Sequence, residues 1–222
     1  MRIASLVRLF RSSSILFRAC GILCGVLGAA VVASGAEPVP HLVKSWTTAD
    51  GLPQNTVNAI AETPDGYLWV GTRSGLARFD GVRFVSFGLS EGLKGLHIRA
   101  FLEDGGGGLW IATFGGGLSR LKDGVIRTWT TADGLLSNEV LCLARDGGDG
   151  LWVGTILGLQ HLGKNGFSPV GGDVLGKVPS MAMTPDDGLW VVSDKARLAR
   201  IRSGPVFTAE KQPAPFGFNV SR

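Results

Sequence analysis

Short runs of apolar and β-branched residues alternate along this chain with segments rich in glycine and aspartate. Runs of this length are typical of β-strands, and Asp-Gly dipeptides favour the tight turns that join antiparallel strands. One run recurs four times around a tryptophan, at Trp69, Trp110, Trp152 and Trp190, with spacings of 41, 42 and 38 residues. A repeat of about 40 residues that holds several strand-like runs predicts a β-propeller, in which each repeat forms one blade.

The pattern predicts an all-β fold of four antiparallel blades with four strands each. In the first two repeats the expected strands are 57–61, 68–72, 76–80, 84–87, 98–102, 109–113, 118–122 and 126–129. In the last two repeats they are 140–144, 151–155, 159–162, 167–170, 178–183, 189–193, 198–201 and 206–208. One more strand, of the outer type, is expected at 42–47, where it would be left without a blade of its own.

The four tryptophans are expected to pack blade against blade, because a large aromatic side chain contributes much buried apolar area. An aromatic ligand cage is the alternative, but cage residues converge on one point, whereas these residues occur once per repeat. Two glycine tracts, 105–108 and 115–117, are interpreted as hairpin turns. Neither leads from a strand into a helix, as a phosphate-binding loop does.

The first 36 residues have the pattern of a secretory signal peptide. Arginines begin the segment, an apolar run from Ala19 to Ala33 follows, and small residues end at Ala36. That order predicts export to the periplasm, with cleavage after Ala36 or, as second choice, after Ala33. If the segment is not cleaved, it would anchor the protein in the membrane.

Removal of this segment changes the charge of the chain. The full sequence has 22 Lys and Arg against 18 Asp and Glu, and the first 36 residues hold four arginines and no acids. The remainder is therefore formally neutral, which argues against nucleic acid as a partner. Only Cys142 remains among the cysteines, so no intramolecular disulfide can form. Its apolar neighbours indicate a buried position on an inner strand, and a reactive thiol is the alternative.

Three motifs in order carry a resemblance to a known family. They are Gly51-Leu52-Pro53-Gln54-Asn55-Thr56-Val57, Asp65-Gly66-Tyr67-Leu68-Trp69-Val70-Gly71-Thr72 and Gly75-Leu76-Ala77-Arg78-Phe79-Asp80-Gly81. Together they resemble the two-component regulator propeller repeat, and the resemblance extends from His41 to Thr208. We therefore expect a signal peptide at 1–36, repeats at 37–208, and a tail or the start of another repeat at 209–222.

The resemblance implies the extracytoplasmic sensor half of a bacterial signalling receptor. In that family seven-bladed propellers precede a histidine kinase or diguanylate cyclase, and many receptors respond to carbohydrates. Four blades would then be part of a seven-bladed ring, so we expect an incomplete propeller whose open blade edges can self-associate. No output domain is found in this sequence, and the output would come from a missing domain or a partner chain.

Propeller geometry places the loops before the inner strands and those between second and third strands at one end of the blades. The residues expected there are Asn55, Arg73, His97, Phe114, Asn138 and Lys195. Such amides, cations and aromatic rings suit a saccharide or another small polar ligand. The alternative for Asn55 and Asn138 is that they cap turns. We expect no catalytic residues, cofactor or metal. An envelope interaction scaffold is the alternative function, and a propeller enzyme acting on polysaccharide is less favoured.

Overall fold

A computed structural model of the 222-residue chain describes residues 42–148, 150–172, 175–184, 188–202 and 208–211. The chain divides into two units, Met1–Val43 and Lys44–Arg222. The expected signal peptide and its cleavage site lie outside the described residues, as do residues 212–222 of the expected tail. No helix within the described part of the chain is long and apolar enough to cross a membrane.

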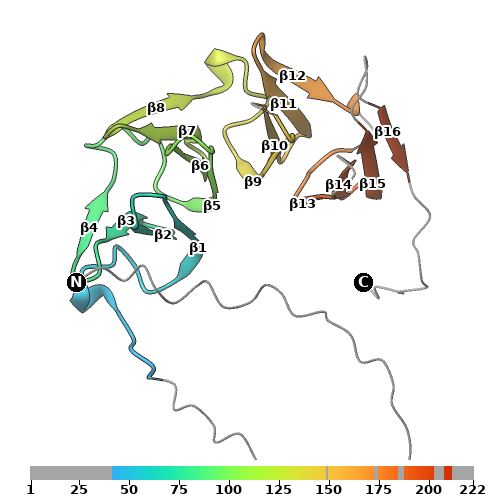
Figure 1. Ribbon diagram of the computed structural model, residues 1–222. Helices are drawn as coiled ribbons and strands as arrows, with labels where there is room; N and C mark the ends of the chain where they lie inside the picture. The colour runs from blue at the N-terminus through green and yellow to red at the C-terminus, as the bar shows by residue number, and fades with distance from the viewer. Residues whose placement is uncertain (1–41, 149, 173–174, 185–187, 203–207, 212–222) are drawn as a thin grey trace, which may run out of the picture. The chain divides into compact units, whose positions relative to one another are not determined.

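The second unit consists of four antiparallel sheets, each with four strands in chain order (Figure 1). The first two sheets comprise β1 (Val57–Glu62), β2 (Leu68–Thr72), β3 (Gly75–Phe79), β4 (Phe84–Phe87), β5 (Ile98–Glu103), β6 (Leu109–Thr113), β7 (Gly117–Lys122) and β8 (Val125–Trp129). The last two comprise β9 (Val140–Arg145), β10 (Leu151–Thr155), β11 (Leu159–Gly163), β12 (Gly166–Val170), β13 (Ser180–Met183), β14 (Gly188–Ser193), β15 (Arg197–Arg202) and β16 (Thr208–Lys211). The prediction of four four-stranded blades is confirmed.

Two of the expected strands are wrong. Residues 42–47 form no strand, because a strand needs a hydrogen-bonded neighbour and no described strand pairs with this segment. Instead Trp46 packs on the first blade, with its ring 5.3 Å from that of Phe79 and 6.5 Å from that of Phe84. The outer strand of the fourth blade was expected at 206–208. It runs from Thr208 to Lys211, beyond the expected end of the repeats, and pairs with β15.

Neighbouring blades meet through their inner strands. β1 lies beside β5, β5 beside β9, and β9 beside β13, while β4, β8, β12 and β16 lie on the opposite side of the sheets (Figure 1). Each junction holds an apolar core with residues from two blades. In the first junction Trp69 and Leu76 pack with Ile98 and Leu109. Since each sheet covers its neighbour, the core is a series of layers between blades.

The recurring tryptophans differ in how well they are covered. Trp69 and Trp152 are buried, and Trp110 is half-buried against the apolar core of the second junction. Each of these three lies against a leucine of the next blade, which precedes that blade's own tryptophan. Trp190 is half-buried and belongs to none of the buried clusters among the described residues. Trp190 was expected to pack against a neighbouring blade, but no described blade covers it.

The residue two positions after each tryptophan controls how closely blades approach. This residue is Gly71, Ala112, Gly154 or Val192 in successive blades. A Cβ atom on Gly154 would lie 2.5 Å from Sγ of Cys142 and 2.9 Å from the carbonyl oxygen of Val178 in the next blade. Val192, which no described blade covers, is 45 % exposed. Small residues therefore occur where a following blade packs.

Each tryptophan also has a basic or imidazole side chain beside it on the third strand. The cross-strand pairs are Trp69 with Arg78, Trp110 with Arg120, Trp152 with His161, and Trp190 with Arg200. In the second blade, Nε of Arg120 donates to the Asp104 carboxylate at 2.8 Å. In the third blade, Nε2 of His161 lies 2.7 Å from the Asp146 carboxylate. Both aspartates occur six residues before the tryptophan of their blade.

Cys142 lies on the inner strand β9, as expected. Its thiol lies 3.3 Å from the carbonyl oxygen of Val178. Burial raises the pKa of the thiol to about 12, against smaller opposing effects of Arg99 and a backbone hydrogen bond. A thiol with that pKa is protonated at neutral pH, so the geometry disfavours the reactive alternative.

We expect Gly154→Ala to lower the free energy of unfolding by about 1–3 kcal/mol, because the added methyl group overpacks the third junction against a backbone oxygen. Urea denaturation followed by tryptophan fluorescence measures the change. Val192→Ala, which alters the same repeat position without a covering blade, serves as control and is expected to change it by less than about 1 kcal/mol. Equal effects of the two substitutions would contradict the role assigned to this position.

The Asp104–Arg120 pair predicts a pH dependence of stability. Burial acts to raise the pKa of Asp104, but hydrogen bonds from Arg120, Gly106 and Gly108 and the charge of Arg120 outweigh it, so its pKa is lowered in the folded protein. The stabilisation is therefore present above the ordinary aspartate pKa of about 4 and is lost as pH falls through the lower folded pKa. We expect Asp104→Asn to be less stable at pH 7 and to lose less stability than wild type between pH 7 and pH 3. A parallel loss in both proteins would show that this pair does not contribute.

Candidate functional site

The loop end of the blades, as expected, is formed by the segments before the inner strands and by the connections between second and third strands. Backbone hydrogen bonds tie neighbouring blades together there. The N–H of Gly75 donates to the carbonyl of Leu96 at 2.9 Å, and that of Gly117 donates to the carbonyl of Asn138 at 2.9 Å. These bonds place side chains from two successive blades close together.

Three of the predicted site residues meet at the junction of the first and second blades. The N–H of Phe114 donates to the carbonyl of His97 at 2.8 Å, and the two ring centroids are 5.6 Å apart. Phe114 is 44 % exposed, so part of its ring faces solvent. Arg73, on the β2–β3 connection, is exposed and lies near enough to influence the charge of His97. We call Arg73, His97, Arg99 and Phe114 the loop-end cluster.

The imidazole of His97 has an unused polar atom. Its Nε2 is buried and has no hydrogen-bond partner among the described residues. Burial lowers the pKa of His97, and the charges of Arg99 and Arg73 lower it further. The ring is therefore neutral at pH 7, with one nitrogen that donates and one that accepts a hydrogen bond. A ligand placed beside it could supply the missing partner.

Arg99 was not identified from the sequence. It lies on β5 at an irregularity of the β5–β6 register, where Ile98 and Ala100 pair with consecutive residues of β6. The extra residue belongs to a β-bulge, which re-aims the side chain of an inner strand. In the first blade the residue at the corresponding bulge, Asn58, donates from Nδ2 to the carbonyl of Ile98 at 3.0 Å. The spacing of apolar residues gives no signal for such a bulge.

A shallow groove of about 440 Å³ lies next to the loop-end cluster. Ser74 and Leu96, which line it, are the chain neighbours of Arg73 and His97. The other lining residues are Pro53, Ser86, Phe87, Gly88, Leu89, Ser90 and Glu91. The Glu91 carboxylate accepts from the Gly88 N–H at 2.6 Å and from the Ser90 hydroxyl at 2.8 Å. The groove therefore combines hydroxyl groups with apolar surface, and no sequence motif identified it.

The remaining predicted residues lie elsewhere or have other roles. Oδ1 of Asn55 accepts from the Thr48 N–H at 2.8 Å, and Oδ1 of Asn138 accepts from the Thr131 N–H at 2.9 Å. Both amides thus bond to the first residue of a short 3-10 helix, η1 (Thr48–Asp50) or η2 (Thr131–Asp133), which favours the capping interpretation. Lys195 is exposed on the β14–β15 connection of the fourth blade and is not part of the cluster.

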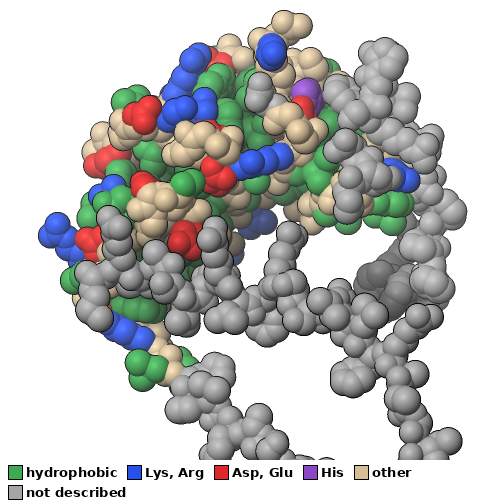
Figure 2. Space-filling view, in the orientation of Figure 1, with side chains coloured by type: hydrophobic (Ala, Val, Ile, Leu, Met, Phe, Trp, Pro, Cys, Tyr) green, Lys and Arg blue, Asp and Glu red, His purple; other side chains and the backbone are tan. Residues whose placement is uncertain are grey.

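Within the described part of the chain, no group of three or more His, Cys, Asp or Glu side chains is placed to hold a metal ion. On the face seen in Figure 2, acidic and basic side chains are interspersed over the sheets. The glycine tract 105–108 lies in the β5–β6 connection, and the tract 115–117 lies in the β6–β7 connection up to Gly117, which begins β7, as the turn interpretation predicts.

Comparison with known proteins identifies the repeats. The model of the two-component regulator propeller family matches residues 51–74, 92–115 and 134–156. Histidine kinase P4 of Formosa agariphila is 47 % identical over 49 residues, which are 22 % of this chain and 4 % of that protein. The match therefore spans a small part of this relative's length.

Solved structures share the fold. The extracellular domain of a hybrid two-component system from B. thetaiotaomicron superposes with a TM-score of 0.68 and 21 % identity, over 80 % of this chain and 27 % of that one. A second such domain from the same organism superposes with a TM-score of 0.61 and 18 % identity, over 73 % of this chain and 25 % of that one. Virginiamycin B lyase from Staphylococcus aureus superposes with a TM-score of 0.57 and 17 % identity, over 74 % of this chain and 58 % of the lyase.

At these identities the superpositions establish the fold, whereas the family rests on the matched repeats. The matched segments are the turn before β1 through the β2–β3 connection and their counterparts in the next two blades. The fourth blade is outside the matched residues but has the same strand order. Each of the first three blades of this chain therefore contains a segment that matches the two-component regulator propeller repeat.

Proposed function

We propose that this chain provides the extracytoplasmic sensor propeller of a bacterial signalling receptor and binds a small polar ligand at its loop end. The family of its repeats and the extracellular domains that share its fold support the sensor role. The basic start and apolar run of residues 1–36 support export. In this proposal the protein is not an enzyme, and a kinase or cyclase domain or a partner chain provides the output.

The unpartnered Nε2 of His97 is the observation that carries the ligand-binding part of the proposal. The imidazole centroid is 5.6 Å from that of the exposed Phe114 ring, Arg99 and Arg73 are close enough to lower the pKa of His97, and a groove lined by serines lies beside it. A buried polar atom without a partner is costly, and a ligand hydroxyl that bonds to it removes that cost. Phe114 offers an apolar face, and Arg73 offers several N–H donors. A saccharide combines the hydroxyl groups and the flat apolar faces that match this surface.

The chain is much shorter than the solved sensor domains that share its fold. The chain covers about a quarter of each of the two solved sensor domains, 27 % and 25 %. We propose that the four blades belong to a larger ring, completed by further repeats or by another copy through the open blade edges. The loop-end cluster would then be one part of a binding face shared by several blades.

A panel of neutral and uronate-containing oligosaccharides, screened against the purified full chain by saturation-transfer NMR, tests the proposal. We expect at least one to bind, and His97→Ala and Phe114→Ala each to weaken that binding about tenfold or more in calorimetry. The reason is that a hydrogen bond to a buried group, or stacking on an aromatic ring, contributes about 1–3 kcal/mol, and 1.4 kcal/mol is tenfold.

Lys195→Ala is the matched control, because this residue was predicted to lie on the same loop face but belongs to the fourth blade. It is expected to leave affinity unchanged. Failure of every saccharide to bind, or binding that survives both cluster substitutions, would contradict the proposed site. Specific capture of an envelope protein by a chain that binds no saccharide would instead favour the scaffold alternative.

A further inference from the structure

The four repeats can be compared position by position, and the first lacks a carboxylate that the second and third have. The residue six positions before the tryptophan is Asp104 in the second blade and Asp146 in the third. Each carboxylate is bonded to the basic or imidazole group beside the tryptophan, Arg120 or His161. In the first blade the same position is Thr63, and the group beside the tryptophan is Arg78.

Thr63 does not replace the missing carboxylate. Its hydroxyl lies 2.6 Å from Oδ1 of Asp65 and 3.0 Å from Nε1 of Trp69, so both its donor and its acceptor are used. Nε of Arg78 is buried and has no hydrogen-bond partner in the described part of the chain. The guanidinium packs instead over the ring of Tyr67, 4.1 Å from its centroid. This stacking attracts the charge but gives the N–H groups no acceptor.

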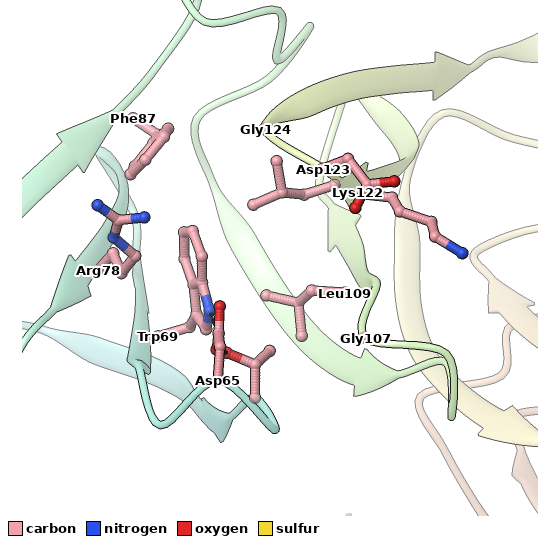
Figure 3. A pocket seen from close by; sticks show the side chains of 11 residues that line it. Asp65, Trp69, Arg78, Phe87, Gly107, Leu109, Lys122, Asp123 and Gly124 are labelled. Carbon is pink, nitrogen blue, oxygen red and sulfur yellow. Dashed lines mark hydrogen bonds between the residues drawn. The ribbon is translucent and has the colours of Figure 1, made fainter.

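A cavity of about 190 Å³ adjoins Arg78 at the junction of the first and second blades. Figure 3 shows Arg78, Trp69 and Phe87 on one side of it and Leu109 and Lys122 on the other. It is formed by the β1–β2, β5–β6 and β7–β8 connections, at the opposite end of the strands from the loop-end cluster. A ligand there would contact a different set of residues from the saccharide site proposed above, with Phe87 as the lining residue that the cavity and the loop-end groove share.

The next junction has an equivalent cavity in which the arginines are paired with carboxylates. A cavity of about 280 Å³ between the second and third blades is lined by Asp104, Arg120, Glu103 and Arg145. Arg120 is paired with Asp104, and Arg145 with Glu103. Each of these two arginines has its own carboxylate, whereas Arg78 at the first junction has none among the residues that the structure describes. For the arginine beside the tryptophan, the difference lies in Thr63, which stands where the second blade has Asp104, while both blades have the same strand order.

We propose that the first junction is a binding site for a small monocarboxylate with an apolar body. The ligand carboxylate would give Arg78 the acceptor that Asp104 gives Arg120, in the charge-assisted geometry that guanidinium groups favour. Trp69, Leu109 and Leu121 provide apolar walls for the body of the ligand. A cavity of about 150 Å³ holds benzene, so this one has room for a single ring with a carboxylate.

The charges at the cavity limit the ligand to one negative charge. Lys122 adds a second cation, but the carboxylates of Asp65 and Asp123 also line the cavity. A dianion such as phosphate or a dicarboxylate would bring its second charge near these acids, and like charges in a partly desolvated site repel. Arg78 offers a buried N–H without an acceptor among the described residues, which matches one carboxylate.

Calorimetric titration of the full chain with benzoate tests this site, with benzamide as the neutral ligand of the same shape. We expect benzoate to bind, and benzamide to bind at least about tenfold more weakly, since a hydrogen bond to a charged group contributes about 1.5–3 kcal/mol. Phthalate, a dicarboxylate on the same ring, is also expected to bind more weakly. Benzoate that does not bind, or that binds no better than benzamide, would overturn the proposal, and equal binding of phthalate would overturn the limit to one charge.

Two substitutions locate the site. Arg78→Gln removes the cation, and Thr63→Asp supplies the internal carboxylate found in the second blade; each is expected to weaken benzoate binding about tenfold or more. Arg83→Gln removes an equal charge from an exposed side chain on the same blade and is expected to have no effect. Thermal melts establish that each variant is folded, and Thr63→Asp keeps the test decisive if Arg78→Gln does not fold. Unchanged binding in a folded Thr63→Asp protein would place the carboxylate elsewhere.

Discussion

The contact between the tryptophan of one blade and the leucine of the next is the interaction on which the rest of this structure depends. A four-stranded sheet has two faces, and an isolated sheet would leave both apolar faces in water. Trp69 against Leu109 and Trp152 against Leu189 cover these faces in pairs, and both leucines are buried almost completely. Burial of an aromatic side chain of this size contributes several kcal/mol per junction. Each blade is therefore stable only as the neighbour of another.

Because blades must pack on one another, only certain residues can occur at the other positions of the repeat. A bulky tryptophan fills a junction only if the backbones approach closely two residues later, which is why Gly71, Ala112 and Gly154 have little or no side chain there. Close approach also brings the connections of successive blades together, so that His97 and Phe114 come to lie beside Arg73. The polar groups at both ends of the strands are thus positioned by apolar packing between them.

The strands could be predicted almost to the residue because their signals are local. The Leu-Trp run, the Asp-Gly turns and the period of about 40 residues each depend on neighbouring residues in the sequence. The segment 42–47 could not be predicted in this way, because strand formation depends on a partner that the segment does not have here. The outer strand of the fourth blade was placed too early for a similar reason: its position is set by pairing with β15, not by its own apolar residues.

The candidate site was predictable only in part. Propeller geometry brought Arg73, His97 and Phe114 to one end of the blades, but Arg99 depends on a bulge, which spacing does not reveal. The amides of Asn55 and Asn138 repeat because the turn they hold repeats. A residue that recurs with the same partner in each blade has a structural role, and departures from that recurrence are more informative about function.

Thr63 is such a departure, and it became visible only when the structure paired Asp104 with Arg120 and Asp146 with His161. In sequence, threonine at this position is an unremarkable turn residue, which also occurs as Thr184 in the fourth blade. In the first junction it leaves a charged donor beside a cavity with apolar walls. The packing of the blades does not need a carboxylate there, since Trp69 is buried and bonded to Thr63 without one. A framework held by apolar layers thus leaves its ionic positions free to vary, and in the first repeat that freedom leaves Arg78 without the internal carboxylate that Arg120 has in the second.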